Sequence, residues 1–172
     1  PMSMTLRSKY STLTQFLIEE RRRFPSASGD FNALILDVAL ACKGIARAVA
    51  YGELAGVMGN HPSEVGTAVN VQGETQKKLD VLANDVFIGR TEWSGNLAGM
   101  ASEEMEAPCQ IPKQYPRGNY LIVFDPLDGS SKVDTDGGVA TIVTLYRKGD
   151  DNNLLGKTGH DIQAVFYILY GS

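Results

Sequence analysis

Apolar residues repeat at intervals of three and four over residues 31–49, the strongest amphipathic pattern in the chain. This spacing predicts a long helix with one buried face. A shorter helix is predicted to begin at Thr12, because Thr12 and Gln15 have the spacing of a capping box, and to end near residue 24. Cys42 lies on the apolar side of the long helix, so we expect it to be a small core residue.

Three later segments have the composition of β-strands. Residues 120–124, 139–146 and 162–170 are rich in β-branched and aromatic side chains. Two helices followed by these strands predict an α+β fold, a layered α/β sandwich with two long helices packed on a mostly antiparallel sheet.

The region between the helices and the strands has a weaker pattern. Residues 67–71 alternate apolar and polar side chains, which predicts a short strand that delivers Glu74 from a loop. Apolar spacing over residues 79–86 predicts another helix, and a modest strand is expected to end near Ala101, just before Glu103.

Composition narrows the possible functions. The chain has 172 residues, a net charge of −4 and two cysteines. Neither a basic stripe nor a long apolar run is present, which argues against a nucleic-acid partner or a membrane association. Two cysteines do not make a disulfide framework, so we expect a reducing cytoplasm.

Two carboxylates follow the strand at 120–124. Pro126 favours a tight turn there, which can bring Asp125 and Asp128 to one side while the carbonyl of Leu127 faces the same point. Such an all-oxygen set suits a hard cation such as Mg²⁺. The alternative interpretation is an ordinary Asx turn after a core strand.

A second feature follows at once. Gly129 allows a close approach of the backbone to a ligand, and the amides and hydroxyls of Ser130 and Ser131 can then surround a phosphate. A metal beside a phosphate site indicates phosphoryl chemistry.

Residues 125–131 resemble the signature of class I fructose-1,6-bisphosphatases, within the lithium-sensitive, Mg²⁺-dependent sugar phosphatase superfamily that includes inositol monophosphatases. Residues 73–85, 102–104 and 170–172 resemble three further blocks of that family, in the family's order. The resemblance covers almost the whole chain from about Thr12.

The resemblance implies hydrolysis of the 1-phosphate of fructose 1,6-bisphosphate, in gluconeogenesis or the Calvin cycle, with two or more Mg²⁺ ions. Asp80 and Glu104 would orient and deprotonate the attacking water. The implied metal ligands are Glu74, Glu103, Asp125, Asp128 and the carbonyl of Leu127. The implied substrate-binding residues are Asp128, Gly129, Ser130 and Ser131.

The resemblance also implies a regulatory AMP site. The matching residues are Ser28, Gly29, Asn32, Tyr120 and Arg147. Asn119 stands where the family usually has a basic residue, which removes a positive charge from this site. We therefore expect little inhibition by AMP.

The implied domain organisation is a leader over residues 1–11 and an N-terminal domain over residues 12–172. By the resemblance, a C-terminal substrate domain and one further acidic ligand belong beyond Ser172, and the assembly is a homotetramer. We therefore expect this chain alone to bind Mg²⁺ weakly and to have little bisphosphatase activity. The alternatives are a broader sugar bisphosphatase, an inositol-phosphate phosphatase and an inactive regulatory module.

Overall fold

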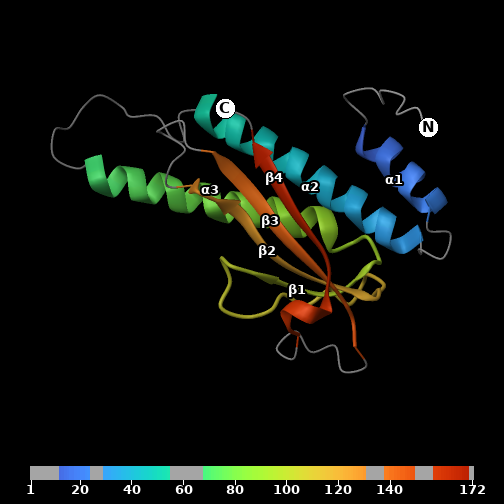
Figure 1. The fold of residues 1–172 in the computed structure, drawn as a ribbon. Coiled ribbons are helices and arrows are strands. Elements are labelled where there is room, and N and C mark those ends of the chain that lie inside the picture. The colour runs from blue at the N-terminus through green and yellow to red at the C-terminus, as the bar shows by residue number, and fades with distance from the viewer. Residues whose placement is uncertain (1–11, 24–28, 55–67, 131–137, 150–156, 171–172) are drawn as a thin grey trace, which may run out of the picture.

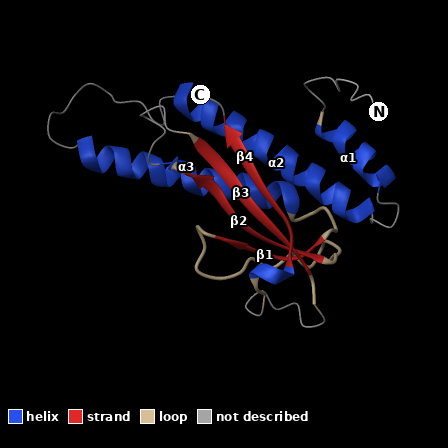
Figure 2. Ribbon diagram, viewed as in Figure 1, coloured by secondary structure: helices blue, strands red, loops and turns tan. Residues whose placement is uncertain are grey.

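A computed structural model describes residues 12–23, 29–54, 68–130, 138–149 and 157–170. Figures 1 and 2 show helices on one side of a single sheet. In chain order the elements are α1 (Leu13–Arg23), α2 (Gly29–Leu54), α3 (Ala68–Thr91), β1 (Leu97–Ser102), β2 (Tyr120–Asp128), β3 (Val139–Arg147), the 3-10 turn η3 (Gly159–Asp161) and β4 (Ile162–Tyr170).

The sheet has the strand order β1-β2-β3-β4. The pair β1 and β2 is parallel, whereas the other two pairs are antiparallel. The α+β fold with a mostly antiparallel sheet is therefore confirmed.

The hydrophobic core lies between the sheet and the helices α2 and α3. Phe87 of α3 stacks on Phe124 of β2 with 4.1 Å between ring centroids, and Phe31 of α2 contacts the ring of Tyr120. Helix α1 lies outside α2 and contributes Leu17 to the same core. The helices therefore cover one face of the sheet.

The opposite face of the sheet is apolar and open. Along β4, half-buried and exposed residues alternate, as the two-residue period of a strand requires. Its exposed residues are the polar Gln163 and the large hydrophobic residues Val165, Tyr167 and Leu169, of which the last three are each more than half exposed.

The first two helices follow the sequence prediction. The amide of Gln15 donates a hydrogen bond to Oγ1 of Thr12 at 3.1 Å, so Thr12 caps α1. The side chain of Gln15 bonds Glu19 instead of returning to the cap. Helix α2 buries Cys42 as expected, and it continues to Leu54, beyond the predicted end at residue 49.

The predictions of a strand over residues 67–71 and of a loop at Glu74 were wrong for the part that the structure describes, which begins at residue 68. Residues 68–71 are helical and not a strand, and Glu74 lies within α3 and not in a loop. Figure 1 shows the first turns of α3 extending beyond the sheet. A helix that runs past the sheet needs no continuous apolar face there, and the sequence of these turns carries no helical period.

Strand β2 is longer than predicted. It runs through Pro126 to Asp128, with a shift of register between Asp125 and Asp128. Strand β1 pairs with β2 only as far as Phe124, so Pro126 lies past the parallel ladder, where its missing amide removes no hydrogen bond to β1.

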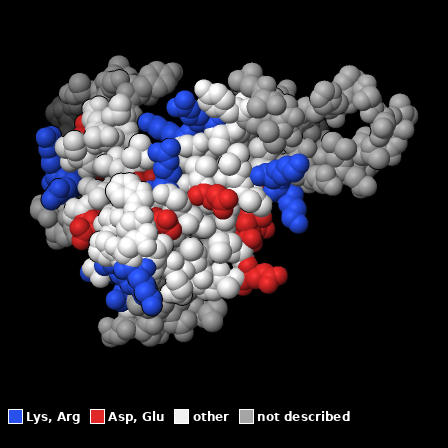
Figure 3. Space-filling model, turned by 180° about the vertical axis from the view of Figure 1, so that it is seen from behind, with Lys and Arg blue, Asp and Glu red and all other residues white. Residues whose placement is uncertain are grey.

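Three further features concern helix hydrophobicity, surface charge and the cysteines. In the part of the chain that the structure describes, no helix is long and apolar enough to cross a bilayer. Figure 3 shows acidic and basic side chains interspersed on one face, without a continuous basic surface. Both cysteines are free; Cys42 is buried and Cys109 is half-buried.

Candidate active site

The topology brings the ends of two strands together. Because β1 and β2 are parallel, their carboxyl ends lie at one edge of the sheet. Glu103 and Glu104 follow β1 directly, and Asp125 and Asp128 lie at the end of β2. The amide of Glu103 donates to the carbonyl of Phe124 at 2.9 Å, which ties the two ends together.

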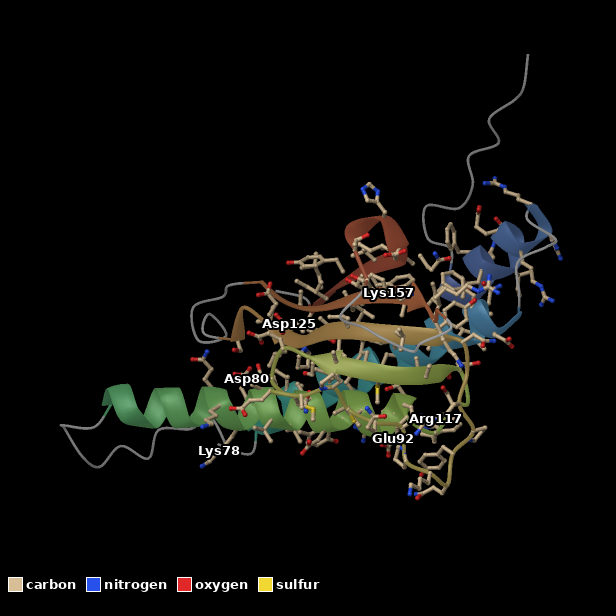
Figure 4. All side chains as sticks on the ribbon, turned by 90° about the horizontal axis from the view of Figure 1, so that it is seen from below. Lys78, Asp80, Glu92, Arg117, Asp125 and Lys157 are labelled. Atoms are coloured by element: carbon tan, nitrogen blue, oxygen red, sulfur yellow. The ribbon has the colours of Figure 1, made fainter. Side chains whose placement is uncertain are left out.

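Helix α3 adds a fifth carboxylate. Figure 4 shows Asp80 and Asp125 at the same end of the molecule, with Arg117 and Glu92 at the other. Lys78, two residues before Asp80, lies on the side of α3 away from the sheet. Asp80, Glu103, Glu104, Asp125 and Asp128 are called the acidic cluster below.

The acidic cluster holds like charges close together. Burial raises the pKa of Asp80, and the Glu103 carboxylate raises it further, against a lowering hydrogen bond from Ser130. Burial also raises the pKa of Glu104, with Asp80 and Glu103 as the next causes. No member of the cluster forms an ion pair with a described lysine, arginine or histidine. The cluster therefore lacks compensating positive charge within the described residues.

Asp125 has the same kind of environment. Burial raises its pKa most, the amide of Leu127 lowers it by a hydrogen bond, and three neighbouring carboxylates raise it again. That amide lies 3.1 Å from Oδ1 of Asp125, which is the Asx turn foreseen as the alternative interpretation. Asp125 therefore forms the Asx turn and also belongs to the acidic cluster, so both interpretations of this segment can hold.

The donor set suits a hard divalent cation. Oδ1 of Asp80 is buried and has no hydrogen-bond partner, an arrangement that a cation would relieve. Among the described side chains, however, no three His, Cys, Asp or Glu residues stand close enough to hold a metal ion as they are placed. The side chain of Glu74, a predicted ligand, lies outside the described part of the structure.

The segment after the cluster is held tightly. Gly129 has φ of +79°, and a Cβ there would lie 3.0 Å from the carbonyl oxygen of Gly138. The position therefore requires glycine for its own backbone. Ser130 accepts a hydrogen bond from Nε2 of Gln76 at 3.1 Å, which joins this turn to α3, and Ser131 lies outside the described residues.

Several polar residues around the cluster were not singled out from the sequence. Oγ1 of Thr141, fully buried on β3, donates to the carbonyl of Pro126 at 2.9 Å and contacts the hydroxyl of Tyr170. Ser102 and Asn84 form a buried pair beside Glu104. The sequence signal that could have found such a residue is a polar side chain inside an otherwise apolar strand. Thr141 in β3 is an example.

A hollow lies beside the cluster on the open side of the sheet. Its volume is about 380 Å³, and its walls include Glu103 and Asp125 together with Val123, Ile142 and Thr144. The acidic groups of two strand ends therefore face a space that a small molecule can enter.

The predicted AMP residues lie at the other end of β2. Tyr120 and Arg147 are direct partners across β2 and β3. The start of α2, which carries Gly29 and Asn32, approaches them through the contact of Phe31 with Tyr120. Ser28 lies outside the described residues. The described members thus gather at one end of the sheet, away from the acidic cluster.

The fold and the cluster define a class: an α+β sandwich domain with carboxylates collected where two parallel strands end. Residues 11–172 match the family model "Fructose-1-6-bisphosphatase, N-terminal domain", and the chain belongs to this family.

Two relatives show the same likeness in sequence. The chain is 63% identical over 165 residues to the class 1 fructose-1,6-bisphosphatase of Hydrogenophilus thermoluteolus, covering 93% of this chain and 45% of that protein. It is 59% identical over 137 residues to a class 1 fructose-1,6-bisphosphatase of Methylibium petroleiphilum, covering 80% and 37%. The chain thus spans less than half the length of these relatives.

Solved structures agree in fold. The Leishmania major fructose-1,6-bisphosphatase in its holo form is 29% identical with a TM-score of 0.69, covering 96% of this chain and 46% of that chain. The same protein in its T-state is 27% identical with a TM-score of 0.71, covering 96% and 49%.

Proposed function

We propose that this domain carries most of the catalytic carboxylates of an enzyme that hydrolyses the 1-phosphate of fructose 1,6-bisphosphate. The single observation that carries the proposal is the acidic cluster, gathered from α3, β1 and β2 without a described positive partner. The relatives, named as class 1 fructose-1,6-bisphosphatases, support the choice of substrate.

Mg²⁺ is the proposed cofactor, with two or more ions in the site. Glu103, Asp125 and Asp128, with Glu74 and the carbonyl of Leu127, would hold it. When bound, the metal lowers the pKa of water and neutralises charge that develops on the phosphoryl oxygens.

Asp80 and Glu104 have the second role, that of orienting the attacking water and accepting its proton. A general base works best when its pKa lies near the working pH, and burial shifts both groups in that direction. Gly129 and Ser130 would bind the phosphate through the backbone amides of their turn.

Assembly, regulation and location are further proposals. We propose a homotetramer in the cytoplasm, acting in gluconeogenesis or the Calvin cycle, with light scattering as the test of assembly. We also propose that Gly29, Asn32, Tyr120 and Arg147, with Ser28, form a phosphate-binding site for AMP. Because Asn119 supplies no positive charge, inhibition is expected to be weak, and an AMP titration of activity measures it.

The test measures phosphate release by the longest natural polypeptide that contains residues 1–172. With Mg²⁺ present, we expect faster turnover of fructose 1,6-bisphosphate than of sedoheptulose 1,7-bisphosphate or inositol monophosphate. Asp125→Asn is expected to lower the rate by at least about 100-fold, whereas the exposed Asp85→Asn on α3 leaves it unchanged. Preference for the inositol ester, or no turnover at all, contradicts the proposal.

A further inference from the structure

We propose that Asn84 and Ser102 act as a clamp that positions Asp80 relative to Glu104. This inference rests on the proposed function. The hydroxyl of Ser102 donates to Oδ1 of Asn84 at 2.6 Å, and the amide of Glu104 donates to the same hydroxyl at 3.2 Å. Both clamp residues are only 7% exposed. A chain of two hydrogen bonds therefore runs from α3 to the backbone of Glu104.

The clamp connects the two elements that carry the proposed water-handling carboxylates. Asn84 follows Asp80 by four residues, so both lie on the same side of α3. Ser102 is the last residue of β1 and directly precedes Glu103 and Glu104. The hydrogen bond between them therefore fixes one turn of α3 against the end of β1.

Packing alone does not require a polar pair at this place. The neighbouring core positions on α3 are Leu79, Ala83 and Phe87, which are nearly inaccessible to solvent. Two apolar side chains could fill the same space, and replacing both partners of a buried hydrogen bond by apolar groups is often nearly neutral for stability. An apolar pair would not fix the orientation of α3 relative to β1, because hydrophobic contacts are not directional.

The clamp matters because the two carboxylates come from different elements. Asp80 is carried by α3 and Glu104 by the segment after β1, so their spacing depends on how these two elements are held together. The short buried hydrogen bond between Ser102 and Asn84 holds that spacing. We therefore expect removal of the clamp to impair the chemical step more than substrate binding.

Two substitutions test the clamp in the longest natural polypeptide that contains these residues. Ser102→Ala removes the bond, and Ser102→Thr keeps a hydroxyl. Loss of a residue that orients the primary catalytic groups costs about 10–100-fold. We expect Ser102→Ala to lower kcat by that factor with KM nearly unchanged, to weaken Mn²⁺ binding measured by electron paramagnetic resonance about tenfold, and Ser102→Thr to restore both.

The chain offers a control at the carboxyl end of α3, where this helix makes a second buried polar contact with β1. Thr91 of α3 is fully buried and contacts Sδ of Met100 on β1 at 3.3 Å. Thr91→Val therefore also removes a buried polar contact between α3 and β1, together with the bond from this hydroxyl to the carbonyl of Phe87 at 2.8 Å, but it leaves the bond between Ser102 and the amide of Glu104 in place. We expect kcat and Mn²⁺ affinity of Thr91→Val to stay within about twofold of the wild type.

A double variant separates folding from positioning. Asn84→Leu with Ser102→Ala replaces both partners by apolar groups, so we expect a melting temperature close to that of the wild type together with the low kcat of Ser102→Ala. Wild-type kcat in a folded double variant overturns the clamp, as does an equal loss in Thr91→Val or a failure of Ser102→Thr to restore activity.

Failure of the proposed function gives a different pattern. A wild type that releases no phosphate but loses Mn²⁺ affinity on Ser102→Ala contradicts the proposed reaction and supports the clamp. A wild type that neither hydrolyses the sugar phosphate nor binds Mn²⁺ overturns both.

Discussion

Asp80 is partly buried and lies near other carboxylates, so its negative charge lowers the stability of the folded chain. Asp80→Asn removes the repulsion within the acidic cluster. Without divalent cations at pH 7, we expect a small rise in the melting temperature, of at most about 2 °C, because solvent screens part of the repulsion at this partly exposed group. The same substitution is expected to lower kcat about 100-fold or more. Asp85→Asn, an exposed change on the same helix, is expected to alter neither quantity in calorimetry and phosphate release.

The pH dependence of stability follows from the same residues. The pKa values of Asp80, Glu104 and Asp125 are raised by burial first and by neighbouring carboxylates as well. The folded state therefore holds protons more tightly than the unfolded state, and stability falls as pH rises from the ordinary carboxyl range through the raised values. In metal-free buffer, we expect unfolding by urea to show this loss in the wild type. In the double variant Asp80→Asn, Glu104→Gln, the free energy of unfolding should depend less on pH. An unchanged pH dependence contradicts its assignment to these carboxyl groups.

Glycine positions offer a paired test of the backbone after the cluster. Gly129→Ala places a Cβ at positive φ and close to the carbonyl of Gly138, so we expect a loss of about 1–2 kcal/mol in the free energy of unfolding. Gly89→Ala lies on exposed α3 with open space around it and is expected to gain about 0.5–1 kcal/mol. Urea unfolding of both variants measures the difference, and equal effects would contradict the strained turn.

At the scale of elements, the contact of α3 with β2 holds the helix that carries Asp80. Phe87 is fully buried and stacked on Phe124. Phe87→Ala is expected to lower the free energy of unfolding by about 3–5 kcal/mol, because it leaves a cavity between the two elements. Phe16→Ala on α1, where the ring is 50% exposed, is expected to change it by less than about 0.5 kcal/mol. Chemical denaturation measures both losses. Equal losses for the two variants would contradict a core that lies between α3 and β2.

Elements were predictable from sequence where one face meets the core along their whole length. The strand over residues 162–170 was predicted with its exact bounds, because β-branched and aromatic side chains fill this segment and a polar loop precedes it. Helix α2 was recognised for the same reason. The first part of α3 was mistaken for a strand and a loop, since it extends past the sheet and only Leu79 begins the buried face.

The candidate site divides in the same way. The segment from Asp125 to Ser130 stood out because proline, glycine and carboxylates are concentrated there. Asn84 and Ser102 lay inside segments that resemble the family, but no role was assigned to them, because the two residues meet across eighteen residues of sequence. A hydrogen bond between distant residues leaves no periodic signal, so it becomes visible only in the folded chain.

At the scale of the whole molecule, the uneven distribution of negative charge affects stability. The chain carries a net charge of −4, and the acidic cluster concentrates negative charge at one edge of the sheet. A divalent cation that binds the folded state only must stabilise it, by about 2.7 kcal/mol when its concentration is 100 times its Kd. We expect residues 1–172 to gain thermal stability in millimolar Mg²⁺.

Scanning calorimetry with MgCl₂ against NaCl at equal ionic strength tests this linkage, because salt screening alone acts in both solutions. Chelation is expected to reverse the gain, and Asp125→Asn is expected to abolish most of it while raising the metal-free melting temperature. Asp85→Asn keeps the full response. An equal rise in NaCl would mean that the carboxylates are only screened, and the acidic cluster would then be an electrostatic burden and not a metal site.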